Sequence, residues 1–245
     1  MVTHYYQALN RLLIAVLLLW STDVLAQVTW PNEPAGSTVI NDWGWNSCPG
    51  GGWLLAFGCG TIVSDGTAPL SPSNTYQHTY NPSTDVGGGD PFVVLNLQHE
   101  IYIAWWMKLS DPYTGCTNQS NKIGIMGLTD GSWAWLKAEG PQGGPFRLVA
   151  SFQVTDFTLN NCHNDGYGDD FPCPPGNFTF TPNVGDSTVP LGEWFRVELY
   201  YKRSSSKTAR DGIVRVWMNG TKVIETTEAN YTSADFESYS FTPTW

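Results

Sequence analysis

A period-two alternation of a mostly apolar and a mixed face, repeated along the sequence, is the feature that most limits how this chain can fold. In residues 101–108, Ile, Ile, Trp and Met share one face, while Tyr, Ala, Trp and Lys share the other. Residues 146–153, 194–201 and 213–218 alternate in the same way. Successive side chains of a β-strand point to opposite faces, so this pattern predicts strands with one apolar and one mixed face. No long stretch after residue 26 has the apolar spacing of three and four that an amphipathic helix requires.

Two dipeptides typical of tight hairpin turns lie between predicted strands, Asp130-Gly131 and Asn219-Gly220. Both tolerate positive φ angles, so we expect two-residue turns that join antiparallel strands. Many strands, hairpin turns and no helix predict an all-β protein, built as an antiparallel β-sandwich or barrel in one domain.

The N-terminal residues are typical of an export signal. An apolar run at residues 12–20 follows Arg11 and is followed by small residues up to Ala26. A membrane anchor would need about 20 apolar residues, and this run is much shorter. We therefore predict a signal peptide over residues 1–26, a single mature domain over 27–245, and a secreted, extracellular or periplasmic protein without a membrane span.

Export changes the interpretation of the cysteines, because disulfides persist in an oxidising compartment. Cys48 and Cys59 have the same separation as Cys162 and Cys173, and each pair encloses a short loop. We expect the bridges Cys48–Cys59 and Cys162–Cys173, with Cys116 left over, although the sequence leaves other pairings open. A zinc site is disfavoured because the chain has no C-x-x-C motif and no His pair at ligand spacing.

One acidic loop offers oxygen ligands of the kind that calcium prefers. It contains Asp165, Asp169 and Asp170, but it lacks the spacing of an EF-hand, and acidic surface loops are common. Calcium is the one cofactor that the sequence suggests, and an ordinary solvated loop is the alternative.

Charge excludes one large class of function. Charged residues make up 14% of the chain, aromatic residues another 14%, and the net charge is −10. Duplex nucleic-acid binding depends on excess positive charge, so it is disfavoured.

Residues 27–107 contain no Lys or Arg, whereas basic residues gather at 196–222. A local basic surface of this kind could attract an anionic polysaccharide, and a solvated polar turn at 202–210 is the alternative.

The mixed faces of the predicted strands carry the best candidates for a binding site. Sugar rings stack on aromatic side chains, and their hydroxyl or carboxylate groups bind forked donors. If the apolar faces form the core, one sheet surface should present all of the following: Trp106, Lys108, Arg147, Gln153, Arg196, Glu198, Tyr200, Arg215 and Trp217. The alternative is a structural ladder of cross-strand ion pairs, in which Arg196 or Arg215 holds Glu198.

Residues 193–200 and 211–220 resemble the paired strands of concanavalin A-like jelly-roll domains, the superfamily of lectins, glucanases and several polysaccharide lyases. Residues 121–124 and 65–74 are similar to segments of secreted bacterial members. The resemblance implies two curved antiparallel sheets whose concave face forms a carbohydrate groove. Members usually end in a strand that returns beside the first, and residues 240–245 do not show it, so we expect a truncated sequence or a missing last strand, with an exposed sheet edge.

Motifs for catalysis are incomplete. The Glu-x-Asp-x-x-Glu motif of jelly-roll glucanases is absent. Of three motifs of jelly-roll alginate-type lyases, only Arg-x-Glu-Leu has a match, at Arg196 and Glu198. In a lyase, Arg196 would neutralise the substrate carboxylate and Tyr200 or Tyr102 would act as the base, its pKa lowered by a neighbouring Arg.

Three hypotheses for function remain. The first is a secreted polysaccharide-binding jelly-roll domain that uses an aromatic, Arg- and Glu-lined concave face. The second is a polysaccharide lyase or, less favoured, a glycoside hydrolase of the same fold. The third is a structural surface or matrix protein in which the tryptophans belong to the core.

Overall fold

The computed structural model describes residues 30–42, 44–45, 61–70, 74–79, 92–115, 120–153, 177–206, 208–229 and 233–241. The chain divides into two units, Met1–Glu33 and Pro34–Trp245. In the described end of the first unit, the Glu33 amide donates to the Trp30 carbonyl at 3.1 Å. All the strands belong to the second unit.

The described residues contain strands and no helix, as predicted. In that part of the chain, therefore, no helix is long and apolar enough to cross a membrane. The strands are β1 Thr61–Ser64, β2 Asn74–Gln77, β3 Phe92–Gln98, β4 Glu100–Met107, β5 Ser120–Leu128, β6 Trp133–Glu139, β7 Arg147–Gln153, β8 Asn177–Phe180, β9 Phe195–Lys202, β10 Gly212–Met218, β11 Thr221–Ala229 and β12 Phe236–Ser240.

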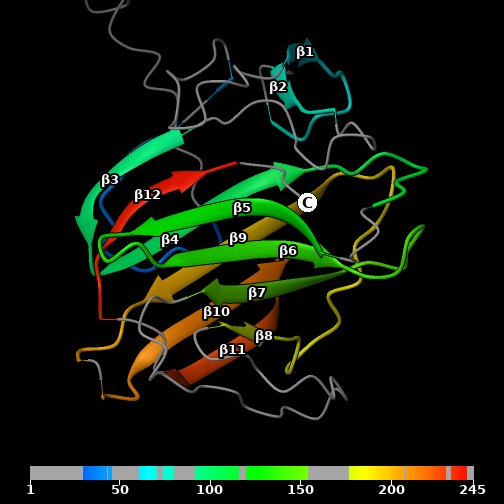
Figure 1. Cartoon of the computed structure of the whole chain (residues 1–245). Coiled ribbons are helices and arrows are strands. Elements are labelled where there is room, and N and C mark those ends of the chain that lie inside the picture. Colours follow the sequence, from blue (N-terminus) through cyan, green and yellow to red (C-terminus); the bar gives the residue numbers. More distant parts are fainter. Residues whose placement is uncertain are drawn as a thin grey trace, which may run out of the picture. The chain divides into compact units, whose positions relative to one another are not determined.

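These strands form two large antiparallel sheets and one small one (Figure 1). The six-stranded sheet has the order β3-β12-β5-β6-β7-β8, and the four-stranded sheet has the order β11-β10-β9-β4. Among the described residues, β1 and β2 pair only with each other. The all-β architecture predicted from the alternating segments is confirmed, and the two sheets agree with the jelly-roll sandwich that the resemblance implied.

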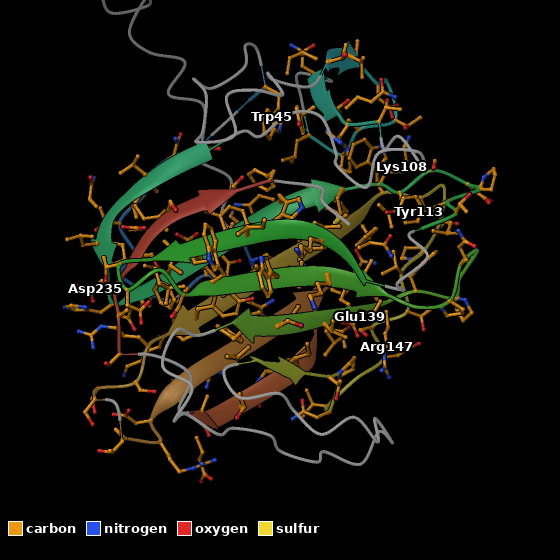
Figure 2. All side chains as sticks on the ribbon, viewed as in Figure 1. Trp45, Lys108, Tyr113, Glu139, Arg147 and Asp235 are labelled. Carbon is orange, nitrogen blue, oxygen red and sulfur yellow. The ribbon has the colours of Figure 1, made fainter. Side chains whose placement is uncertain are left out.

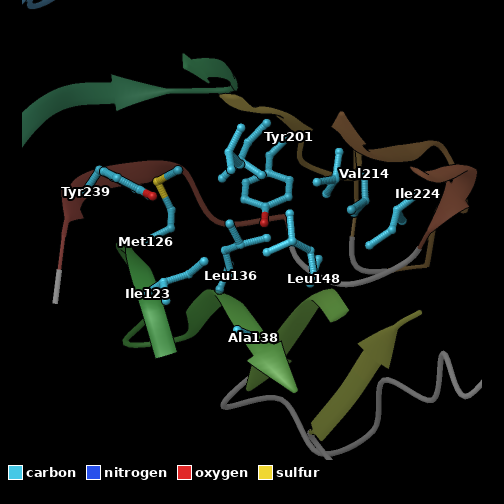
Figure 3. Packing of buried hydrophobic residues seen from close by; sticks show 14 of the residues in the cluster. Ile123, Met126, Leu136, Ala138, Leu148, Tyr201, Val214, Ile224 and Tyr239 are labelled. Carbon is cyan, nitrogen blue, oxygen red and sulfur yellow. The ribbon is translucent and has the colours of Figure 1, made fainter. Parts of the chain in front are cut away.

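The apolar faces of the two large sheets pack against each other to form the core (Figure 3). Val197, Leu199 and Tyr201 of β9 are buried on one side, as the alternation predicts. The Tyr201 ring lies 5.5 Å from that of Phe152 in β7 and 6.3 Å from that of Phe236 in β12, between ring centroids. Because β7 and β12 belong to the six-stranded sheet, Tyr201 connects the two layers.

The two predicted turns have different lengths. Asn219 and Gly220 both have positive φ angles, 51° and 84°, and Met218 pairs directly with Thr221, so this two-residue turn is confirmed. The Asp130 turn is one residue longer than predicted. The Leu128 amide donates to the Ser132 carbonyl at 3.1 Å, so residues 129–131 form a three-residue loop.

β12 is the last described strand, and it pairs with β3 on one side and with β5 on the other. It is therefore an internal strand of the six-stranded sheet. Residues 242–245 lie outside the described residues, so the expectation of a truncated sequence or a missing last strand stays a prediction.

Several predictions fall outside the described residues. These are the signal peptide over 1–26, the bridges Cys48–Cys59 and Cys162–Cys173 with Cys116, and the calcium candidates Asp165, Asp169 and Asp170. They stay predictions. In the described ranges, no three His, Cys, Asp or Glu side chains gather in a way that could hold a metal ion.

Two buried tyrosine hydroxyls allow a test of how hydrogen bonding in the core affects stability. The Tyr201 hydroxyl is buried without a hydrogen-bond partner among the described residues, and burial raises the pKa of the group. The buried hydroxyl of Tyr113 instead donates to Asn121 Oδ1 at 3.3 Å. An unsatisfied buried hydroxyl costs about 1–3 kcal/mol, whereas a satisfied one contributes about 1 kcal/mol.

We therefore expect Tyr201→Phe to leave the free energy of unfolding unchanged or to raise it by about 1 kcal/mol. Tyr113→Phe, the matched control, should lower it by about 1 kcal/mol. Urea unfolding followed by tryptophan fluorescence measures both. Equal losses in the two variants would contradict the assignment of Tyr201 as unsatisfied.

Candidate functional site

The structure divides the predicted binding residues between the two sheets. The outward side chains of β4, β9 and β10, here called the β4–β9–β10 face, include all but two of them: Trp106, Arg196, Glu198, Tyr200, Arg215 and Trp217, with Lys108 directly after β4. Arg147 and Gln153 lie in β7 of the six-stranded sheet. The prediction that one sheet surface presents the whole set is therefore wrong.

Glu198 forms the centre of the β4–β9–β10 face and is completely buried there. Its two carboxylate oxygens accept from Tyr102 Oη at 2.6 Å and from Arg196 Nε at 2.9 Å. The Arg196 amide in turn donates to Asn219 Oδ1 at 2.9 Å, which ties β9 to the β10–β11 turn. Of the two partners that we considered for Glu198, the structure selects Arg196.

A second group of charges on this face is also paired internally. Arg215 Nε donates to Glu225 Oε1 at 2.9 Å, and Lys222 Nζ lies 2.8 Å from the same oxygen. The Tyr200 hydroxyl donates to Glu100 Oε2 at 2.6 Å. These contacts form the cross-strand ladder that we gave as the structural alternative.

The environment of the two tyrosines does not suit a catalytic base. Burial, followed by the hydrogen bond to Glu100, raises the pKa of Tyr200 to about 12, although Arg215 acts in the opposite direction. The predicted lowering of the Tyr200 pKa by a neighbouring Arg is therefore wrong. Tyr102 uses its proton to bind Glu198. In this structure both hydroxyls therefore donate to carboxylates of the protein.

The aromatic residues of this face differ in their accessibility. Trp217 is only 7% exposed, so its ring belongs mainly to the packing of the face. Trp106 is half-buried, and the Arg196 guanidinium lies 5.8 Å from its ring centroid. Trp106 is therefore more accessible as a stacking surface than Trp217.

A different arrangement lies on the outward side chains of β5, β6 and β7, here called the lysine face. Lys122 of β5 stands directly opposite Lys137 of β6. Their ammonium nitrogens lie 4.9 and 5.5 Å from the ring centroid of Trp135, which is two residues from Lys137. The two cations and the ring thus form one half-buried cluster.

Arg147 extends the lysine face at one end. It pairs in register with Glu139, and Figure 2 shows both side chains at the same end of β6 and β7. Glu139 Oε1 lies 3.6 Å from Lys137 Nζ. The described charged side chains of this face are those of Lys122, Lys137, Arg147 and Glu139, so they are mainly positive in a chain whose net charge is −10.

Sequence reasoning identified the strands of the lysine face but not its chemistry. Counting back from a two-residue turn at Asp130-Gly131 would pair Lys122 with Glu139, an ordinary ion pair. The three-residue loop and a register shift between Lys122 and Gly124 instead bring Lys122 opposite Lys137. Such a shift is a β-bulge, which redirects side chains and leaves little signal in a single sequence.

Comparison with known proteins gives a fold and no family. No protein-family model matches the sequence, and no curated protein matches it. Among solved structures, an endo-β-1,4-glucuronan lyase from the fungus Trichoderma reesei has a TM-score of 0.51 and 17% identity, over 82% of this chain and 79% of that one. This likeness shows that the chain shares the fold of that structure.

Two alginate lyases are more distant. A mutant of Aly36B in complex with alginate trisaccharide has a TM-score of 0.46 and 13% identity over 64% of each chain, so this chain spans less than two thirds of that protein. Alginate lyase vAL-1 from Chlorella virus has a TM-score of 0.44 and 13% identity, over 74% of this chain and 73% of that one.

The buried pair on the β4–β9–β10 face gives a stability prediction. Arg196→Met would leave the Glu198 carboxylate buried without its cation, so we expect the free energy of unfolding to fall by about 3 kcal/mol. Adding Glu198→Gln should recover much of this loss, because the remaining side chain is neutral. Chemical denaturation of the single and double variants measures both effects.

Arg215→Met is the matched control. Arg215 and Glu225 are 31% and 30% exposed, so loss of this pair should cost about 0.5 kcal/mol. A loss for Arg196→Met no larger than that of the control would contradict the description of Glu198 as a buried charge that depends on Arg196.

Proposed function

We propose that this protein binds an acidic polysaccharide on the lysine face. The observation that carries the proposal is the direct apposition of Lys122 and Lys137 beside Trp135. Like charges opposite each other on neighbouring strands are destabilising, and the side chain of Lys137 is only 14% exposed. An anion bound between the two ammonium groups offsets this cost.

The chemistry of the face suits a sugar that carries a carboxylate. Trp133 and Trp135 lie on the same side of β6, since they alternate with the buried Ala134 and Leu136. An indole ring packs against the CH face of a pyranose, and an ammonium group pairs with its carboxylate. Arg147 adds a forked donor at the end of the row. Of the residues predicted from the sequence, Arg147 and Gln153 belong to this sheet.

Three further considerations support the proposal. One solved structure with the same fold is that of a glucuronan lyase, and glucuronan is an acidic polysaccharide. The apolar run at residues 12–20 predicts export of the protein, and such polymers are found outside the cell. On the β4–β9–β10 face, the carboxylates of Glu198, Glu100 and Glu225 each accept a hydrogen bond or ion pair from a neighbouring side chain.

The proposal is for binding, with catalysis as an outcome to be measured. The tyrosines suggested as a base donate their protons to Glu100 and Glu198. Incubation of the protein with uronate polymers, followed by the ultraviolet absorbance of the unsaturated product, tests for lyase activity. A signal would change the assignment from a binding protein to an enzyme.

Binding itself is tested with Lys137→Gln and Lys122→Gln. A charge-assisted contact contributes about 1.5–3 kcal/mol, so each change should weaken the binding of a polyuronate by roughly tenfold or more. Isothermal titration with a polyuronate and with a neutral glucan measures this. The affinity for the polyuronate should also fall as salt is added.

Lys202→Gln is the matched control, because it removes one charge from an exposed position of β9. It should leave the affinity within about twofold of the unmodified protein. Unchanged binding in both variants of the lysine face, with loss in Arg196→Met at a stability that keeps it folded, would transfer the site to the β4–β9–β10 face.

A further inference from the structure

The segment after β1 contacts the four-stranded sheet beside Lys108. Lys108 Nζ donates to Asp65 Oδ2 at 2.6 Å and lies 5.1 Å from the ring centroid of Trp194. Trp194 Nε1 donates to Thr67 Oγ1 at 3.1 Å. An ammonium group above an indole ring, paired with a carboxylate, thus brings together three separate segments of the chain.

The carboxylate of Asp65 is oriented by its own loop. Its Oδ1 accepts from the Thr67 amide at 2.9 Å and from Thr67 Oγ1 at 2.6 Å, which leaves Oδ2 for Lys108. Hydrogen bonds from Lys108 and Thr67 hold the pKa of Asp65 well below its usual range, so the group stays ionised. The loop therefore presents an ionised carboxylate to Lys108.

The same surface continues along the sheet. Trp106 and Arg196 pair in register between β4 and β9, with the guanidinium 5.8 Å from the Trp106 ring centroid. Each is two residues from Lys108 or Trp194, and side chains two apart share a face of a strand. Two cation–indole pairs therefore lie side by side at this end of the β4–β9–β10 face.

The contact at Asp65 is weak enough to be displaced. The side chains of Lys108 and Asp65 are 30% and 24% exposed, and partly exposed ion pairs contribute little. Among the described residues, β1 and β2 pair only with each other, and a two-stranded hairpin is marginally stable by itself. The position of the loop thus depends on contacts such as this one.

We propose that Lys108 and Trp194 form a second subsite for a carboxylated sugar, which Asp65 occupies as an internal substitute for the carboxylate of the ligand. A bound sugar replaces the Asp65 carboxylate at Lys108 Nζ and stacks on the Trp194 ring, while the loop moves aside. This inference rests on the proposed function only in assuming that the ligand is an acidic glycan, because the two sites lie on different sheets.

The test is a gain of affinity, which a misfolded variant cannot produce. Asp65→Asn removes the competing charge, so a short uronate oligosaccharide should bind about three- to fivefold more tightly. Fivefold corresponds to about 1 kcal/mol, the upper range for such an ion pair. Adding Lys108→Gln should abolish the gain. A gain that persists without Lys108, or no gain at all, would overturn the proposal.

Asp186→Asn is the matched control. Asp186 Oδ1 accepts from the Thr188 amide at 2.8 Å and from Thr188 Oγ1 at 2.7 Å, the same local pattern as at Asp65. Its substitution should leave the affinity unchanged. Thr67→Ala is a second variant that loosens the loop and keeps the Asp65 charge, and it should give a smaller gain. If Asp65→Asn fails to fold, the absence of a gain in Thr67→Ala counts against the subsite.

The same measurements in a Lys137→Gln background separate this inference from the proposed function. If Lys137→Gln binds as the unmodified protein does while Asp65→Asn still gives a gain, the lysine face is wrong and the Lys108 subsite stands. If Lys137→Gln loses binding and Asp65→Asn gives no gain in either background, the lysine face stands and the subsite is wrong.

Discussion

The burial of one side of β9 against the six-stranded sheet determines the surfaces on which function depends. Val197, Leu199 and Tyr201 enter the core, and the contact of Tyr201 with Phe152 joins the two layers. Because side chains alternate, Glu198 must then point outward, and a slip by one residue would exchange the two sets. The core thus fixes the register of the ion pairs on the opposite side of the strand.

The sequence was sufficient to locate the strands and to predict one of the two hairpin turns, whereas the length of the Asp130 turn was wrong. Alternation located the strands, and Asn219-Gly220 identified a turn whose two residues both require positive φ. The sequence alone could not assign strands to sheets. Alternation distinguishes the two faces of a strand, but it does not show which strands lie beside it. Arg147 and Arg196 therefore look equivalent in the sequence although they lie on different sheets.

Chemistry that arises from neighbours was hidden for the same reason. The pKa of Tyr200 rises because Glu100 and burial outweigh Arg215, and only the pairing of β4 with β9 reveals Glu100 as its partner. The apposition of Lys122 and Lys137 depends on a loop of three residues and on a bulge. Each feature changes the register by one residue, and together they replace the expected ion pair of Lys122 and Glu139 by the like-charged pair of Lys122 and Lys137.

The two faces therefore use charge in different ways. On the β4–β9–β10 face, Glu198 is completely buried and its hydrogen bonds come from the protein, so the arrangement mainly contributes to the fold. On the lysine face, Lys122 and Lys137 stand opposite each other beside the ring of Trp135, and Lys137 Nζ lies 3.6 Å from Glu139 Oε1. Sheets that pack face to face lie about 10 Å apart, which keeps Lys108 and Lys137 beyond the reach of one sugar unit. Short oligosaccharides must therefore bind the two sites independently, so that the effects of substitutions at the two sites on the binding free energy add. A long polymer that reached both sites would bind more tightly, because binding at one site raises its effective concentration at the other.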